Sequence, residues 1–308
     1  MDAAAELIPD LRKTLCPICE TDRHDREVYV SNFESKDLNE QVFSARRLPD
    51  RLHYRMVRCR ECGLLRSNPI LSPVALARLY EKSRYTYAAE AIFTRRTYGE
   101  LLRRAAPLAP GRERIMEIGC GSGFFLEDAL AQGFREAHGV EPSTEAIAHA
   151  PEHLRPTIRQ GLYDETTFPA EHFDAVCAFQ VFDHVPDQTA LLRACRKHLK
   201  KGGVALFVNH DARATTARIL GRLSPIIDVE HTALFDKTTF PRIFRKCGFE
   251  VRDVFAVKNT YPLSYWTQLA PLPGLLKSPL LALLRGSSAG RIPITLSAGN
   301  IGILAAKS

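Results

Sequence analysis

The sequence lacks a long apolar run and a recognisable leader. The longest uncharged stretch of its C-terminal third, residues 259–276, contains three prolines and several polar groups, which do not suit a membrane span. The first six residues include two acids and no basic group ahead of an apolar segment, unlike a signal peptide. No internal repeat is visible. We therefore expect a soluble, cytoplasmic protein with no transmembrane segment.

Acidic and basic residues are unevenly distributed. The chain has 308 residues, of which 45% are apolar, and a net charge of +7. This length suffices for two domains with a sizeable core. Residues 111–206 have a net charge of −4, whereas residues 207–308 have +7. A basic surface favours an anionic partner, such as a nucleotide-sugar, a phospholipid surface or RNA; a solvated cationic face is the alternative.

A dinucleotide-binding fingerprint is also absent, although a glycine-rich turn is present. An apolar segment ends in Gly119, Gly121 and Gly123, but the third glycine of a G-x-G-x-x-G pattern would fall at Phe124. Glycines at such a turn let the backbone approach a ligand closely. Glu141 follows the next apolar segment, where a carboxylate can accept hydrogen bonds from a ribose. The pattern indicates a nucleoside-binding βαβ unit.

The G-x-G-x-G spacing, with Glu117 two residues ahead of it, resembles the first motif of class I S-adenosylmethionine (SAM) methyltransferases. Further segments with the same order and spacing are Gly139-Val140-Glu141-Pro142, Phe173-Asp174-Ala175-Val176, Asp183-His184, Lys200-Lys201-Gly202-Gly203, Glu230-His231 and Cys247-Gly248-Phe249. The resemblance covers residues 111–258. It implies an α/β fold: a Rossmann-like, seven-stranded, mostly parallel sheet with helices on both faces, and SAM as cofactor.

The alternation of apolar segments and helical patterns also predicts a parallel sheet. We expect strands near residues 114–118, 137–141, 157–161, 173–179, 203–209, 249–251 and 300–306, and helices near 88–106, 187–199 and 238–247. Residues 259–299 lie where a short hairpin would otherwise connect the last two strands. Their prolines and short apolar pieces predict a helical cap over the substrate, with peripheral membrane contact as the alternative.

Four of the eight cysteines form two C-x-x-C pairs, Cys16 with Cys19 and Cys59 with Cys62. Two such pairs can complete a tetrahedral zinc site, which we expect to be structural because four thiolates leave no open coordination position. Redox-active pairs and disulfides are the alternatives, the latter disfavoured without an export signal. We expect three regions: a zinc ribbon (1–66), a helical linker or lid (67–110) and a SAM-binding methyltransferase domain (111–308).

The zinc-ribbon head and the two acid–histidine pairs narrow the resemblance to methyltransferases of sugar-nucleotide and polysaccharide pathways. This implies a small-molecule acceptor, expected to be anionic, with O- and C-methylation both open. It also implies substrate-facing roles for Tyr85 or Tyr87, His184, Glu230 and His231.

A neutral histidine is the natural general base near neutral pH. His231, with Glu230 beside it, is our first choice, His184 the second, and His210 is predicted to contact the substrate. We predict cofactor contacts from Glu117, Gly119, Cys120, Gly121, Gly123, Glu141, Pro142, Phe179 and Gln180.

Other acceptors remain open. The zinc module and basic flanks also suit RNA. However, the Asn/Asp-Pro-Pro-aromatic motif of many base-amine methyltransferases is replaced by Phe179-Gln180-Val181-Phe182, and no interleaved aromatic platform accompanies the basic residues. A protein or lipid acceptor, or a catalytically silent SAM-binding scaffold, is the remaining alternative.

Overall fold

The computed structural model describes residues 10–34, 37–38, 42–43, 51–85, 88–270 and 272–308. Its centre is a seven-stranded sheet in the order β12-β13-β10-β9-β6-β7-β8. Six of these strands run in the same direction, and only β13, which pairs with β10 and β12, runs antiparallel to them. The predicted α/β fold with a mostly parallel sheet is confirmed. The strands are β6 (Arg114–Ile118), β7 (Glu136–Glu141), β8 (Ile158–Gln160), β9 (Phe173–Phe179), β10 (Leu199–His210), β12 (Phe249–Pro262) and β13 (Pro293–Lys307).

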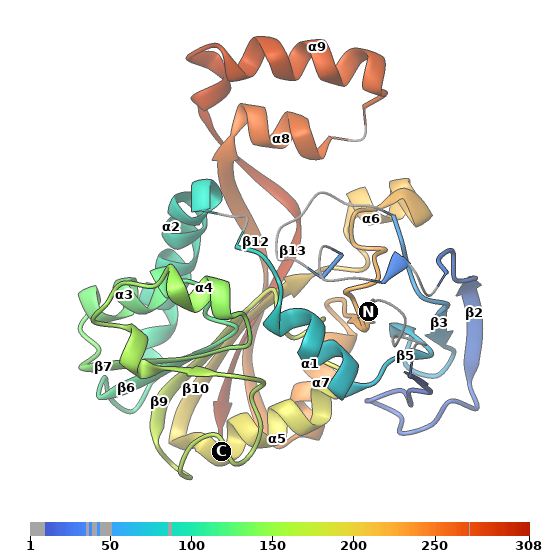
Figure 1. The fold of residues 1–308 in the computed structure, drawn as a ribbon. Helices are drawn as coiled ribbons and strands as arrows, with labels where there is room; N and C mark the ends of the chain where they lie inside the picture. Colours follow the sequence, from blue (N-terminus) through green and yellow to red (C-terminus); the bar gives the residue numbers. More distant parts are fainter. Residues whose placement is uncertain (1–9, 35–36, 39–41, 44–50, 86–87, 271) are drawn as a thin grey trace, which may run out of the picture.

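Helices cover both faces of this sheet (Figure 1). On one face, α2 (Ala88–Ala105) and α3 (Phe124–Ala131) bury Leu102 and Phe125 against the strands. On the other face, α5 (Gln188–His198) and α7 (Thr239–Lys246) bury Leu192 and Phe244. In each helix, apolar residues recur at helical spacing, so one face of the helix is apolar and packs against the sheet. Further helices are α1 (Pro73–Glu81), α4 (Thr144–Ala148) and α6 (Thr215–Leu220).

The N-terminal region forms a second, smaller sheet in the order β11-β4-β3-β2. It comprises β2 (Asp25–Tyr29), β3 (Met56–Cys59), β4 (Leu65–Ser67) and β11 (Ala233–Leu234), and a further pair joins β1 (Leu11–Arg12) to β5 (Ile70–Leu71). Strand β11 follows His231 in the chain, so the C-terminal part of the chain supplies one edge of this sheet. The division at residue 66 stays a prediction; β4 runs across that position.

The last two strands of the central sheet are much longer than predicted. They pair from Phe249 opposite Lys307 to Pro262 opposite Pro293, and α8 (Leu263–Leu269) and α9 (Gly274–Arg285) connect their far ends. The register shifts twice along β12, and such irregularities break the alternation by which a strand is recognised in sequence. The outer parts of these two strands and the two helices form a projection, here called the arm (residues 258–299), visible at the top of Figure 1. Within the described residues, no helix combines the length and apolar character needed to cross a membrane.

Candidate functional site

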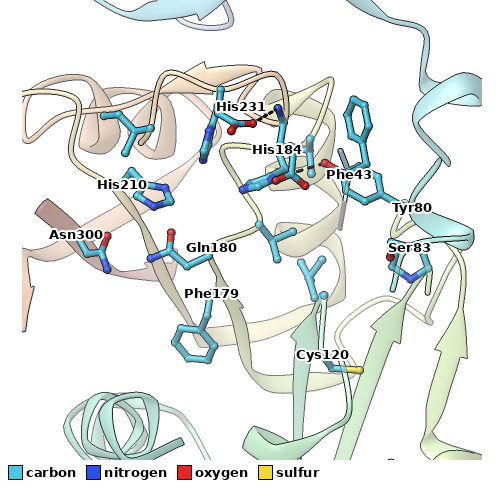
Figure 2. A pocket seen from close by; sticks show the side chains of 18 of the residues that line it. Phe43, Tyr80, Ser83, Cys120, Phe179, Gln180, His184, His210, His231 and Asn300 are labelled. Atoms are coloured by element: carbon cyan, nitrogen blue, oxygen red, sulfur yellow. Dashed lines mark hydrogen bonds between the residues drawn. The ribbon is translucent and has the colours of Figure 1, made fainter. Parts of the chain in front are cut away.

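A cavity of about 1150 Å³ opens at the carboxyl ends of the parallel strands. In open α/β sheets, ligands bind at this edge. Its walls come from the loops after β6, β7, β9 and β10, from the segment before β11, and from the base of the arm. One end therefore contains the glycine-rich turn, and the other contains His184, His210 and His231 (Figure 2).

The glycine-rich turn follows β6 in a conformation that favours glycine. Gly119, Gly121 and Gly123 have φ values of 69°, 54° and 74°, in the left-handed region where a side chain is strained. A Cβ atom at Gly119 would also overlap Cγ2 of Val181. Both the backbone conformation and the close packing thus require glycine at position 119.

The carboxylate of Glu141 fixes the glycine turn to the end of β7. Its Oε2 accepts a hydrogen bond from the backbone N–H of Gly121 at 2.8 Å, and its Oε1 accepts one from Ser143 at 2.8 Å. Burial raises the pKa of Glu141, while these two N–H donors oppose the rise. Glu141 also lines the cavity, so it can hold the turn and face a ligand.

The structure brings most of the predicted cofactor residues together. Those that line the cavity are Glu117, Gly119, Cys120, Glu141, Pro142, Phe179 and Gln180. Gly121 and Gly123 are outside the lining and shape the turn behind it. Gln180 has φ of 58°, and its buried Oε1 has no hydrogen-bond partner in the described part of the chain. A buried oxygen atom without a hydrogen-bond partner is suited to accept a hydrogen bond from a ligand. The individual contacts stay predictions.

At the end that contains the histidines, the predicted site of the acceptor and here called the acceptor end, three imidazoles surround the carboxylate of Asp183, which is 0% exposed. Oδ2 of Asp183 lies 2.9 Å from Nδ1 of His210 and 3.9 Å from Nε2 of His231, and its Oδ1 lies 3.7 Å from Nε2 of His184. The ring centroids of His184 and His210 lie 4.7 and 4.9 Å from that of His231. The three histidines predicted as base or substrate contacts thus share one buried carboxylate.

The three histidines keep Asp183 ionised. Burial alone would raise the pKa of this carboxyl group, but the hydrogen bond from His210 and the charges of the neighbouring imidazoles hold it well below its ordinary value. Sequence analysis included Asp183 only as part of a motif and assigned it no role. The signal that could have identified it is an acid four residues after the largely apolar strand β9, because such a strand is buried on both faces and its carboxyl end faces the ligand-binding edge of the sheet.

The other predicted substrate residues are placed differently. Glu230 lines the cavity and is 8% exposed. Tyr85 lies outside the lining: its hydroxyl group is 3.0 Å from Oγ of Ser122, and its ring stacks on His149. Tyr87 lies outside the described residues. Instead, Tyr80 of α1 reaches the site, where its hydroxyl group is 3.4 Å from Nδ1 of His184.

The four N-terminal cysteines form a compact cluster. Their sulfur atoms all lie within 4.8 Å of one another, with Cys16 and Cys62 3.4 Å apart and Cys19 and Cys59 3.8 Å apart. A tetrahedral zinc site with Zn–S bonds of about 2.3 Å requires sulfur atoms about 3.8 Å apart. The four thiols therefore fit a zinc ion. The other four cysteines, Cys120, Cys177, Cys195 and Cys247, are buried or half-buried in the main domain.

The chain belongs to the methyltransferase-domain family, because it matches that family over residues 90–254, more than half of its length. It is 31% identical over 170 residues to a Mycolicibacterium smegmatis protein named "Probable S-adenosylmethionine-dependent methyltransferase", covering 55% of this chain and 64% of that one. It is 27% identical over 121 residues to the ubiquinone biosynthesis O-methyltransferase of Actinobacillus pleuropneumoniae, covering 35% and 51%. The chain thus spans roughly half to two thirds of the length of these relatives.

A solved SAM-dependent methyltransferase structure from Archaeoglobus fulgidus is 22% identical to the chain, with a TM-score of 0.48, covering 72% of this chain and 100% of that one. The family membership supports SAM as the ligand of the glycine-lined end.

Replacing Gly119 by alanine tests this end of the cavity. The added methyl group would overlap Val181 and strain a left-handed backbone, so we expect SAM affinity, measured by isothermal titration calorimetry, to fall by about tenfold or more. The control is Gly202→Ala, since Gly202 has φ of 74° but no atom within 4 Å of a built Cβ. Unchanged affinity in Gly119→Ala would show that the turn does not hold SAM.

Proposed function

We propose that this protein transfers a methyl group from SAM to a hydroxyl oxygen of a small-molecule acceptor, an intermediate of a saccharide pathway. The observation that supports this most directly is the buried Asp183 carboxylate with three histidines, in the same cavity as the glycine turn. SAM supplies the electrophilic methyl group; the protein must bind both partners and remove a proton from the acceptor.

His210 is best arranged to act as the base. An ionised carboxylate can only accept hydrogen bonds, so Nδ1 of His210 carries the proton shared with Asp183 at 2.9 Å. The Nε2 atom then has the lone pair that can accept a proton from the acceptor hydroxyl group. This is the arrangement by which a buried carboxylate selects one tautomer of a catalytic histidine. We therefore assign the role of general base to His210 and not to His231, which was our first choice from sequence.

His231 and His184 complete the acceptor site in this proposal. His231 is 6% exposed and lies between the other two rings, so it can orient the acceptor or stabilise the protonated base. The hydroxyl group of Tyr80 contacts His184 from α1 and can fix the position of that ring.

The chemistry of the acceptor end favours hydroxyl groups. Its lining includes the carboxylates of Asp187, Asp211, Asp228 and Glu230 beside the histidines. Carboxylates and the unprotonated nitrogen of a neutral imidazole accept hydrogen bonds from hydroxyl groups, and the carboxylates repel a phosphate group. This supports a polyhydroxylated acceptor unit, in keeping with the resemblance to saccharide-pathway enzymes; an anionic acceptor stays a prediction.

We further propose that the four clustered cysteines hold a structural zinc ion. Four thiolates would complete its coordination sphere and tie together the turn at Cys16 and the loop after β3. The amine of Lys246 donates hydrogen bonds to the carbonyl groups of Pro17 and Ile18 within the first knuckle. The zinc site would thereby hold the small sheet against α7 of the main domain.

Methyl transfer should depend on His210. Purified protein is incubated with methyl-labelled SAM and an extract of its source cells, and label is counted in small-molecule, lipid, RNA and protein fractions. We expect label in polar small molecules, reduced by about 10²-fold or more in His210→Ala, because a general base contributes about 10²–10⁴. We expect a smaller loss in His231→Ala and unchanged SAM affinity in both.

The matched control is His138→Ala, since the His138 side chain has a similar exposure, 21% against 26%, but lies outside the cavity lining. Label confined to RNA, protein or lipid would contradict the proposed acceptor. Full transfer by His210→Ala would contradict the proposed base.

The zinc proposal predicts about one zinc ion per chain, measured by elemental analysis of purified protein. Cys59→Ser should lose the ion and unfold at lower temperature, because binding of a structural metal contributes to folding. Cys247→Ser should keep it, since Cys247 lies outside the cluster. Metal-free protein that stays folded and as stable as the metal-containing form would contradict a structural zinc.

A further inference from the structure

The arm ends in a helix whose outer face is apolar and exposed. In α9, Leu276, Leu280 and Leu283 are 63%, 39% and 69% exposed, and their i, i+4, i+7 spacing places them on one side of the helix. Leu275 is 92% exposed, whereas Leu284, on the inner side, is 8% exposed. Single exposed leucines are common, but a continuous stripe of them marks a contact surface.

The opposite side of the arm lines part of the cavity. Helix α8 lies between α9 and the main domain (Figure 1). Its Trp266 donates a hydrogen bond from Nε1 to the carbonyl group of Ile294 at 2.8 Å, which holds α8 on the paired strands. Trp266 and Leu269 line the cavity. A surface that contacts the outer face of α9 would therefore be one helix layer away from the cavity.

The charge of the arm restricts what can cover this face. Asp253 is the last acidic residue of the chain, and five basic residues follow it. Of these, Lys258, Arg285 and Arg291 are exposed. A second copy of the chain that used the same patch would place these cations against one another, which costs free energy. Leucines flanked by cations suit the surface of an anionic bilayer.

We propose that α9 docks the protein on an anionic lipid bilayer, with the stripe Leu275, Leu276, Leu280 and Leu283 in the interface and Arg285 and Arg291 at the lipid headgroups. This goes beyond the proposed methyl transfer and does not depend on it. The cavity would then open close to the membrane surface.

Sedimentation with vesicles tests the proposal. Purified full-length protein is mixed with vesicles of phosphatidylcholine alone or of phosphatidylcholine with phosphatidylglycerol. We expect binding to the anionic vesicles, weakened by salt, and a loss of about tenfold or more in Leu276→Asp/Leu280→Asp/Leu283→Asp, since interfacial binding scales with buried apolar area. Arg285→Glu/Arg291→Glu should reduce binding to anionic vesicles.

The matched control is Val30→Asp/Leu108→Asp, which removes two exposed apolar side chains (63% and 53%) outside the arm and should bind as the unchanged protein does. Three results would overturn the proposal. The first is no sedimentation with either vesicle, and the second is equal sedimentation of the leucine variant. The third is a dimer by light scattering that the leucine variant converts to a monomer, which would make this face an interface between two copies. SAM affinity, which the arm variants should leave unchanged, separates this test from that of methyl transfer.

Discussion

The acceptor end of the molecule depends on one buried group, Asp183. Its side chain accepts the hydrogen bond from His210 at the end of β10. Its backbone carbonyl group accepts hydrogen bonds from the N–H of Thr232 at 2.8 Å and from the Thr232 hydroxyl group at 3.0 Å. Asp183 therefore joins the loop after β9, the end of β10 and the segment before β11. A buried charge with such partners is costly to leave uncompensated, so these three segments stay together.

The same set of contacts links the small N-terminal sheet to the site. The hydroxyl group of Ser67 in β4 donates to the carbonyl group of His231 at 2.8 Å, and the N–H of Ser67 donates to the carbonyl group of Thr232 at 2.9 Å. Beside them, β11 pairs with β4. The N-terminal region thus supports one wall of the acceptor end and also contains the proposed zinc site, whereas the glycine turn and Glu141 are built within the central sheet.

This division also explains how much could be predicted from sequence. The central strands and the glycine turn can be predicted from local patterns, because an apolar run and a glycine-rich spacing are each recognisable within a few residues. The Asp183–His210 hydrogen bond joins residues 27 apart, and the Ser67–His231 contact joins residues 164 apart. No local pattern specifies such contacts, so sequence reasoning found the three histidines but assigned the carboxylate partner to Glu230. The lengths of β12 and β13 were underestimated because β12 is half-exposed and its register with β13 shifts twice.

The most direct test of Asp183 as the organising group is the methyl-transfer rate of Asp183→Asn, with SAM affinity measured on the same sample. Asparagine keeps the shape but removes the charge that holds the proton on Nδ1 of His210. The account predicts a rate reduced by about 10²-fold or more with SAM affinity unchanged, because the glycine turn does not depend on this residue. A rate equal to that of the unchanged protein, or a parallel loss of SAM binding in a folded variant, would contradict it.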